Sequence, residues 1–169
     1  MKNIVLTGFM GTGKTTIGKE LSKMLHMKLV DIDAEIEKAQ KIKINDIFRI
    51  YGEQYFRDIE TDMIKRLSRE ENIIISTGGG AVLRDENMEA LKKNGIIFCL
   101  NASTETIMKR TARSEDRPLL KVEKPREKIS EMLSCRRPFY EKAGVMIETD
   151  CRTPLEIVQE IMEIIRCRK

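Results

Sequence analysis

A glycine-rich segment near the start of the chain constrains its fold more than any other feature. Residues 8–15 read GFMGTGKT and fit the pattern G-x-x-x-x-G-K-[ST]. They stand between an apolar run expected to form a strand, residues 3–6, and an amphipathic stretch expected to form a helix, residues 14–26. The glycines let successive N–H groups turn toward phosphate oxygens, and the helix N-terminus adds a positive field. The segment predicts a phosphate-binding loop; the alternative is a glycine-rich turn that only caps a helix.

The side chains of this loop suit the chemistry of a nucleotide phosphate. The Lys14 ammonium would reach the β- and γ-phosphates, and the Thr15 hydroxyl would ligate Mg²⁺. The expected ATP contacts in the loop are Gly11, Thr12, Gly13, Lys14, Thr15 and Thr16. Such a loop indicates that nucleotide phosphates bind, but it does not separate a kinase from a hydrolase or a GTPase.

Short apolar runs alternate along the chain with longer amphipathic stretches. We expect strands at residues 3–6, 28–30, 73–76, 96–100 and 145–149. We expect helices at 14–26, 34–40, 45–51, 53–69, 85–93 with Gly95 as C-cap, 104–111, 126–134 and 154–166. This alternation predicts an α/β fold with helices on both faces of a parallel sheet. The length indicates one domain, residues 1–169, and the polar stretch 111–124 is expected to be a mobile loop.

Two aspartates follow the second expected strand. Ligands of an open parallel sheet gather at the carboxyl ends of its strands, where Asp31 and Asp33 would lie. In an extended chain, residues two apart point the same way. One carboxylate would then support the Mg²⁺ shell while the other faces a hydroxyl group. The alternative is that the two residues cap the next helix.

Two further segments carry groups suited to an acidic, hydroxylated acceptor. Arg57 and Glu60 are three apart and would share a helix face, so the glutamate would fix the guanidinium fork that binds a carboxylate. A surface ion pair is the alternative reading. The three glycines at 78–80 follow the third strand and permit close backbone approach to a ligand, although a tight turn would also use them.

Composition limits the environment and the partners. The chain has 31 Lys and Arg against 27 Asp and Glu, a net charge of +4, which suits anionic small molecules without deciding among partners. The four cysteines show no zinc-ligand spacing and indicate free thiols in a reducing compartment. The apolar run at 4–6 is too short for a signal peptide, and no stretch approaches a membrane span. We expect a cytoplasmic protein.

The ordered set of segments resembles the shikimate kinases, which transfer the γ-phosphate of ATP to the 3-hydroxyl of shikimate. The segments are GFMGTGKTT at 8–16, DID at 31–33, FRIYGEQYFRDIE at 48–60, STGGGAV at 76–82, RPLL at 117–120 and RRPFYEKA at 136–143. The resemblance implies a P-loop NTPase fold, a three-layer αβα arrangement like that of nucleoside monophosphate kinases, with a five-stranded parallel sheet in the order 2-3-1-4-5. It also implies a shikimate-binding region at about 32–61 and a mobile lid at about 111–124.

The resemblance implies individual roles as well. The catalytic group would be Asp33, which binds the hydroxyl and serves as base, together with Lys14 and the lid arginine Arg117. The shikimate contacts would be Asp33, Arg57, Glu60, Gly79, Gly80 and Arg137, of which Arg57 and Arg137 hold the carboxylate. Further ATP contacts would be Arg117 and, around the adenine, Arg110 and Pro154 with Arg152 nearby. The Mg²⁺ site would involve Thr15 and Asp31.

Two other functions fit parts of this pattern. A gluconate-type kinase has the same architecture, and its acceptor is also a polyhydroxy acid. A non-catalytic nucleotide-binding module would keep the phosphate loop without transferring phosphate, although intact Lys14, Asp33, Arg117 and Arg137 favour an enzyme. We expect ATP and shikimate as substrates, Mg²⁺ as cofactor, no nucleic-acid or membrane partner, and a monomer.

Overall fold

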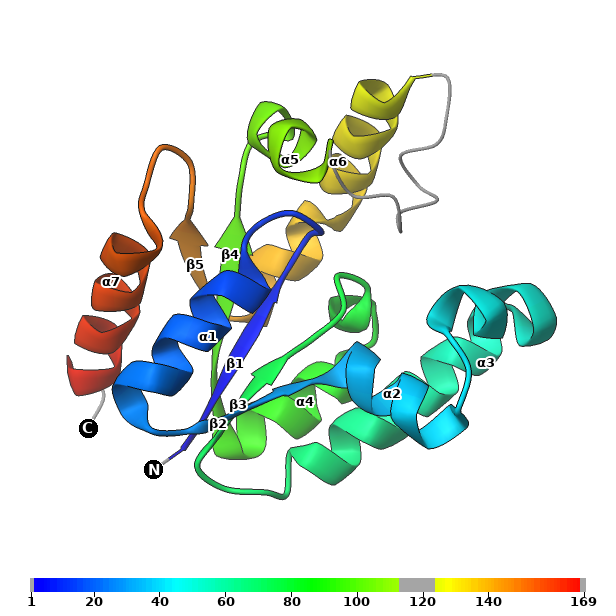
Figure 1. Cartoon of the computed structure of the whole chain (residues 1–169), viewed down its shortest axis with the longest axis horizontal. Coiled ribbons are helices and arrows are strands. Elements are labelled where there is room, and N and C mark those ends of the chain that lie inside the picture. The colour runs from blue at the N-terminus through cyan, green and yellow to red at the C-terminus, as the bar shows by residue number, and fades with distance from the viewer. Residues whose placement is uncertain (1, 113–123, 168–169) are drawn as a thin grey trace.

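The computed structural model describes residues 2–112 and 124–167, and its centre is a five-stranded parallel sheet (Figure 1). The strands are β1 (Asn3–Gly8), β2 (Lys28–Asp31), β3 (Ile73–Ser76), β4 (Gly95–Asn101) and β5 (Val145–Glu148). They lie in the order β2-β3-β1-β4-β5, and Val5 of β1 is level with Ile75 of β3 and Ile97 of β4. The predicted α/β class and the strand order are therefore confirmed.

Helices cover both faces of the sheet because its central strands are apolar on both sides. Ile4 and Leu6 of β1 pack in a cluster with α1 (Lys14–Leu25) and α7 (Pro154–Cys167). Val5, between them, belongs to a second cluster with α3 (Ile44–Leu67), α4 (Asp85–Asn94) and α6 (Pro125–Ala143). This alternation follows from the two-residue period of a strand, and it places β1 at the centre of the core.

Shorter elements lie beyond the carboxyl ends of the strands. They are α2 (Ile32–Gln40), the 3₁₀ turn η1 (Ala81–Leu83) and α5 (Thr104–Thr111). Figure 1 shows α2 and the first part of α3 projecting beyond the β2 edge of the sheet, while α5 and α6 rise beside the loop after β1. Gly52, with φ 82°, breaks α3 between the two helices expected at 45–51 and 53–69. Most of the region expected to bind the acceptor, residues 32–61, therefore lies beyond the β2 edge of the sheet.

One local expectation was wrong. The helix expected at 126–134 continues as α6 to Ala143, through Pro138, which lies on an exposed part of the helix. Gly95 is the C-cap of α4, as expected, but with an extended φ of −136°, because it already pairs with Asn3 as the first residue of β4. Sheet pairing here competes with helix termination, and pairing determines the conformation of this residue.

Within residues 2–112 and 124–167, no helix has both the length and the apolar character that a membrane crossing requires.

Candidate active site

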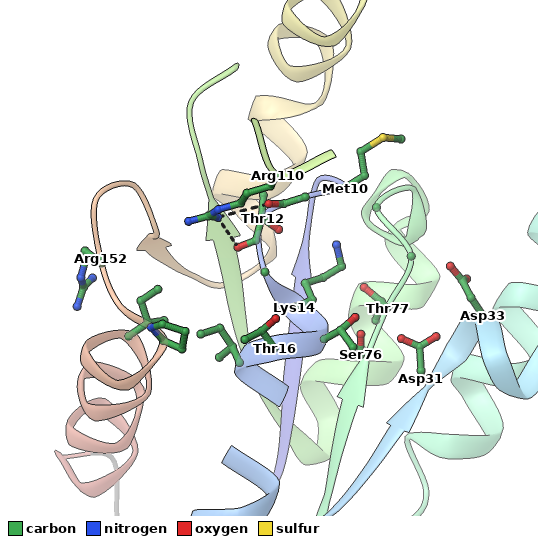
Figure 2. A pocket seen from close by; sticks show the side chains of 18 residues that line it. Met10, Thr12, Lys14, Thr16, Asp31, Asp33, Ser76, Thr77, Arg110 and Arg152 are labelled. Carbon is green, nitrogen blue, oxygen red and sulfur yellow. Dashed lines mark hydrogen bonds between the residues drawn. The ribbon is translucent and has the colours of Figure 1, made fainter. Parts of the chain in front are cut away.

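A cleft of about 800 Å³ opens at the carboxyl end of the sheet (Figure 2). Its walls come from the phosphate loop and α1, the ends of β2 and β3, and residues near α5 and α7. This is the edge where open parallel sheets bind ligands. Residues far apart in the sequence therefore meet here, and most of the predicted site residues are among the lining: Gly11, Thr12, Gly13, Lys14, Thr15, Thr16, Asp31, Asp33, Gly79, Arg110, Arg152 and Pro154.

The loop after β1 adopts a conformation that glycine makes accessible. Gly11 and Gly13 have φ of 77° and 102°, in the left-handed region that other residues rarely enter. Between them, the buried Thr12 hydroxyl donates to the Phe9 carbonyl at 2.8 Å and closes the curve of the loop. Gly13 directly precedes α1, so the N–H groups of the first helical turn face the same end of the cleft.

The loop side chains are placed as a phosphate site requires. Lys14 Nζ donates to the carbonyl oxygens of Gly8 at 2.7 Å and Phe9 at 2.9 Å, which keeps the ammonium on the inner side of the loop. In Figure 2 Lys14 lies between the loop and the aspartates at the end of β2. Thr15 and Thr16 are exposed and line the cleft, so their hydroxyl groups are accessible to a ligand.

Asp31 and Asp33 both line the cleft, but not by the geometry expected. The chain turns helical at Ile32, so Asp33 lies in the first turn of α2 and the two carboxylates do not share one extended strand. Asp31 is the N-cap of this helix, and its Oδ1 accepts from the Ala34 N–H at 3.2 Å. The structure thus shows the capping role that the sequence left open, while a contribution of Asp31 to the Mg²⁺ shell stays a prediction.

The Asp33 carboxyl is in an unusual environment for an acid. Burial, the negative charge of Asp31 and that of Glu60 raise its pKa to about 6, against the opposing effect of Lys14 and Arg57. Its Oδ1 is buried and has no hydrogen-bond partner in the described structure. A β-carbon on Gly78 would lie only 3.1 Å from this oxygen and 3.1 Å from Glu60 Oε1, which also lacks a partner. Gly78 thus leaves room for two acceptor oxygens to approach the same point.

Arg57 and Glu60 share a helix face, as predicted. Arg57 Nη1 donates to Glu60 Oε2 at 2.8 Å, and the Glu60 side chain is fully buried, so this is not a surface ion pair. Burial raises the pKa of Glu60, while the charge of Arg57 works to lower it. Gly80 lies against the guanidinium so closely that a β-carbon there would overlap it. The absence of a side chain at Gly80 therefore leaves space for Arg57. The sequence alone did not indicate this reason for a glycine at position 80.

The side chains of the neighbouring residues Arg136 and Arg137 point in different directions. The side chain of Arg137 is 76% exposed and pairs with Glu141 at 2.8 Å on the outer side of α6. Arg136 is half-buried, its guanidinium lies 5.8 Å from the centre of the Phe9 ring, and its charge lowers the pKa of Glu60. The structure places Arg136 on the side of the phosphate loop and the buried glutamate. Arg137 does not lie on that side, because one step along a helix turns the side chain by about 100°.

Tyr140 is a further contact that the sequence did not single out. One helical turn after Arg136, its buried hydroxyl donates to the Gly79 carbonyl at 2.8 Å. Burial raises the pKa of this hydroxyl to about 12, so it remains a donor. The hydrogen bond fixes the peptide between Gly79 and Gly80 and turns the N–H of Gly80 away from Tyr140. Helix α6 therefore fixes the backbone of the glycine segment through Tyr140 and also determines the position of Arg136.

The residues expected near adenine lie at the opposite end of the cleft. Arg110 donates to the carbonyl oxygen of Thr12 at 3.3 Å and to the Thr149 carbonyl at 2.9 Å. Arg152 forms an ion pair with Glu160, which holds it near Pro154 at the start of α7. Figure 2 shows Arg110 above the loop and Arg152 beside α7. Arg117 and most of the predicted lid lie outside the described residues, so the role of Arg117 stays a prediction.

The strand order of the sheet and the residues of this cleft define the class of protein to which the chain belongs. A phosphate loop stands at one end of a cleft whose other end carries carboxylates and glycines, which is the arrangement of a P-loop kinase that phosphorylates a small molecule. A family model described as shikimate kinase matches residues 10–166. The chain belongs to the shikimate kinase family.

Individual relatives align with almost the whole length of this chain. A shikimate kinase of Thermodesulfovibrio yellowstonii is 52% identical over 96% of this chain and 94% of its own length. One of Persephonella marina is 46% identical over 98% of this chain and all of its own length. Among solved structures, shikimate kinase of Acinetobacter baumannii in complex with shikimate has a TM-score of 0.94 and 37% identity, covering 100% of this chain and 95% of that one.

Proposed function

We propose that this chain transfers the γ-phosphate of ATP to the 3-hydroxyl of shikimate, giving shikimate 3-phosphate and ADP. The observation that carries the proposal is the cleft in which the phosphate loop and the Asp33 carboxylate face one ligand space within a fold of this family. The solved relative that contains shikimate supports this acceptor, because it aligns with the whole of this chain. The family match disfavours the gluconate-type alternative.

At the donor end, the loop residues would hold the ATP phosphates. N–H groups at the start of α1 and the Lys14 ammonium suit the β- and γ-phosphates. Oxygen ligands suit Mg²⁺, and the Thr15 hydroxyl and the Asp31 carboxylate both line the cleft. The ion held there would supply positive charge that offsets the charge of the transferring phosphate group. Thr15 would ligate the ion directly, while Asp31, partly engaged as a helix cap, would accept hydrogen bonds from its water shell.

At the acceptor end, the buried groups match a hydroxylated acid. Arg57 would bind the shikimate carboxylate with its fork, held in place by Glu60. We assign the second carboxylate contact to Arg136, because Arg137 points to solvent. The Gly79–Gly80 backbone, fixed by Tyr140, would contact the ring substituents.

Asp33 would act on the hydroxyl that receives the phosphate. Its unpartnered Oδ1 is an acceptor without a donor, which a substrate hydroxyl would supply. Hydrogen bonding aligns the hydroxyl oxygen with the γ-phosphorus, and phosphoryl transfer depends chiefly on such alignment and on charge neutralisation. As the new P–O bond forms, the hydroxyl proton passes to Asp33 and the bond between the γ-phosphorus and ADP breaks. Arg117 is assigned to the charge of the transferring group from its sequence position alone.

The substrate set also bears on the binding partners, oligomeric state and cellular compartment of the protein. We propose a cytoplasmic monomer in which ATP and shikimate are the partners, with no nucleic-acid or membrane partner. The net charge of +4 suits anionic substrates such as these two molecules. Molecular mass in solution tests the oligomeric state.

Identification of the product tests the proposed reaction. The protein would be incubated with ATP, Mg²⁺ and shikimate, and the products resolved by ³¹P NMR and mass spectrometry. We expect a phosphate monoester on the 3-oxygen and an equal amount of ADP. Formation of ADP and inorganic phosphate without a phosphorylated ring would contradict the proposal.

A further inference from the structure

Arg110 makes more contacts than an adenine-binding residue requires. Its Nη1 donates to the Thr149 hydroxyl at 3.0 Å, to the Thr12 carbonyl at 3.3 Å and, at 3.4 Å, to the Gly11 carbonyl. Its Nη2 donates to the Thr149 carbonyl at 2.9 Å. The guanidinium therefore links the residue after β5 to the main chain of the phosphate loop, and dashed lines mark its bonds to the loop in Figure 2.

Thr149 is the fixed end of this link. It directly follows β5, is fully buried, and its N–H and hydroxyl both donate to the Asn101 carbonyl at 2.9 Å. The hydroxyl lone pairs therefore have one orientation, and Arg110 receives an acceptor whose direction the sheet determines. Arg110 itself is an exposed residue on the last turn of α5, so without this anchor its long side chain would be free to move.

The loop carbonyls that accept from Arg110 are coupled to loop N–H groups. A trans peptide points its C=O and its N–H in opposite directions, so holding the Thr12 carbonyl fixes the direction of the Gly13 N–H. Gly11 and Gly13 both have a left-handed backbone, in a region of the loop where glycine allows the greatest conformational freedom. A contact that restrains these peptides reduces the entropy that the loop would lose when it binds phosphates.

We propose that Thr149 is a positioning residue for nucleotide binding, which aligns Arg110 across the carbonyls of Gly11 and Thr12 and so orders the phosphate loop. The inference rests on the ATP-binding part of the proposed function. It is independent of the acceptor, because none of these contacts involves Asp33 or Arg57.

Affinity for ADP and for inorganic pyrophosphate, measured by isothermal titration calorimetry, tests the proposal. Thr149→Val removes the hydroxyl but preserves the shape, and the Asn101 carbonyl keeps the N–H of residue 149 as donor. We expect both ligands to bind about tenfold more weakly, the scale of losing one hydrogen bond to a charged group. Thr149→Ser retains the hydroxyl and should restore affinity to within about twofold of wild type.

Two controls separate positioning from general loss of stability. In the Arg110→Met background, Thr149→Val should have no additional effect, because the partner through which it acts is gone. Ile165→Val, in the core at the far end of α7, should lower stability without changing ADP affinity. In steady state, the Thr149→Val variant should raise the KM for ATP and leave the KM for shikimate within about twofold of wild type.

The outcomes distinguish the two proposals. Unchanged ADP affinity in Thr149→Val, a loss for ADP without a loss for pyrophosphate, or additive effects with Arg110→Met would overturn the positioning role. A wild-type protein that binds ADP but does not phosphorylate shikimate would overturn the proposed reaction, while the ADP affinities would still decide the role of Thr149.

Discussion

The Arg57 guanidinium lies between two glutamates that differ in exposure, and its buried partner Glu60 is 2.8 Å away with no exposed side-chain surface. The other partner, Glu53, lies 3.2 Å from Nη2 and 3.3 Å from Nε, and its side chain is 65% exposed. Glu60 holds one side of the fork, and Glu53 occupies the edge formed by Nε and Nη2. An incoming carboxylate would bind this edge with two parallel hydrogen bonds. We therefore expect the buried glutamate to position Arg57 and the exposed one to compete with an acidic ligand.

Substitution of the two glutamates should have opposite effects. Glu60→Gln removes the buried charge that fixes Arg57, and we expect the KM for shikimate to rise about tenfold with the KM for ATP unchanged. Glu53→Gln removes a weak, solvent-screened competitor, so the KM for shikimate should fall by about twofold. Initial rates at varied shikimate give both values. An increase of KM in both variants would mean that Glu53 also positions Arg57.

Arg136 and Arg137 provide a matched pair of adjacent residues. Arg136→Met keeps the apolar stem but removes the guanidinium that faces the site, so we expect the KM for shikimate to rise by a factor of about ten or more. Arg137→Met loses only an exposed ion pair with Glu141 and should stay within about twofold of wild type. The same rate measurements decide the assignment. Reversed effects would restore the sequence-based choice of Arg137.

The raised pKa of Asp33 links stability to pH. Because burial raises this pKa from 3.8 to about 6, the folded protein binds more protons than the unfolded chain between these values. The contribution of Asp33 to the free energy of unfolding is therefore lost as the pH rises from about 4 to about 6, on the order of 3 kcal/mol at most. Asp33→Asn should be more stable than wild type at pH 7.5 and equally stable below pH 4. Urea denaturation across this range measures the difference, and a pH-independent difference would contradict it.

The same carboxyl should control activity. Asp33 must be ionised to accept the hydroxyl proton, so kcat/KM for shikimate should rise with pH and level off above about pH 6. Asp33→Asn should retain ADP binding but lose nearly all transfer, because an amide does not accept the proton. A variant with near-normal turnover would remove Asp33 from the mechanism. The gain in stability and the loss of activity together would identify a strained functional group.

Gly80 tests the space that Arg57 needs. Its φ of −94° is accessible to alanine, so Gly80→Ala carries no backbone strain, and the overlap of the new methyl group falls on a flexible guanidinium. We expect thermal stability close to that of wild type but a KM for shikimate raised about tenfold or more, because Arg57 must move. Differential scanning calorimetry and initial rates provide the two readouts. An unchanged KM would show that the displaced arginine still reaches its ligand.

The sequence predicts the parts of this structure that depend on local patterns. The glycine loop, the strands and the Arg57–Glu60 pair follow from spacing along a single element. The direction of Arg136 depends on the phase of α6, in which Ile129, Leu133, Arg136 and Tyr140 recur three or four residues apart. This three- or four-residue spacing is visible in the sequence. The helix expected from the sequence ends at residue 134, however, so it gives no orientation for Arg136 and Arg137.

Other features depend on contacts between distant segments. Gly78 lies between Asp33 and Glu60, and no sequence spacing indicates that these carboxylates approach the same point. The bond from Arg110 to Thr149 joins residues 39 apart in the chain. Asp31 lies between these two groups of features. Its sequence position allowed a helix cap as one alternative, and the structure shows that it does cap α2.

Phosphorylation of shikimate by ATP in this cleft should make ADP release depend on the acceptor. ADP formation would be measured with shikimate, gluconate, quinate and no acceptor, at equal concentrations of protein, ATP and Mg²⁺. We expect rapid ADP release with shikimate, little with quinate or gluconate, and almost none without an acceptor. Equal rates with and without shikimate, or a faster rate with gluconate, would contradict it.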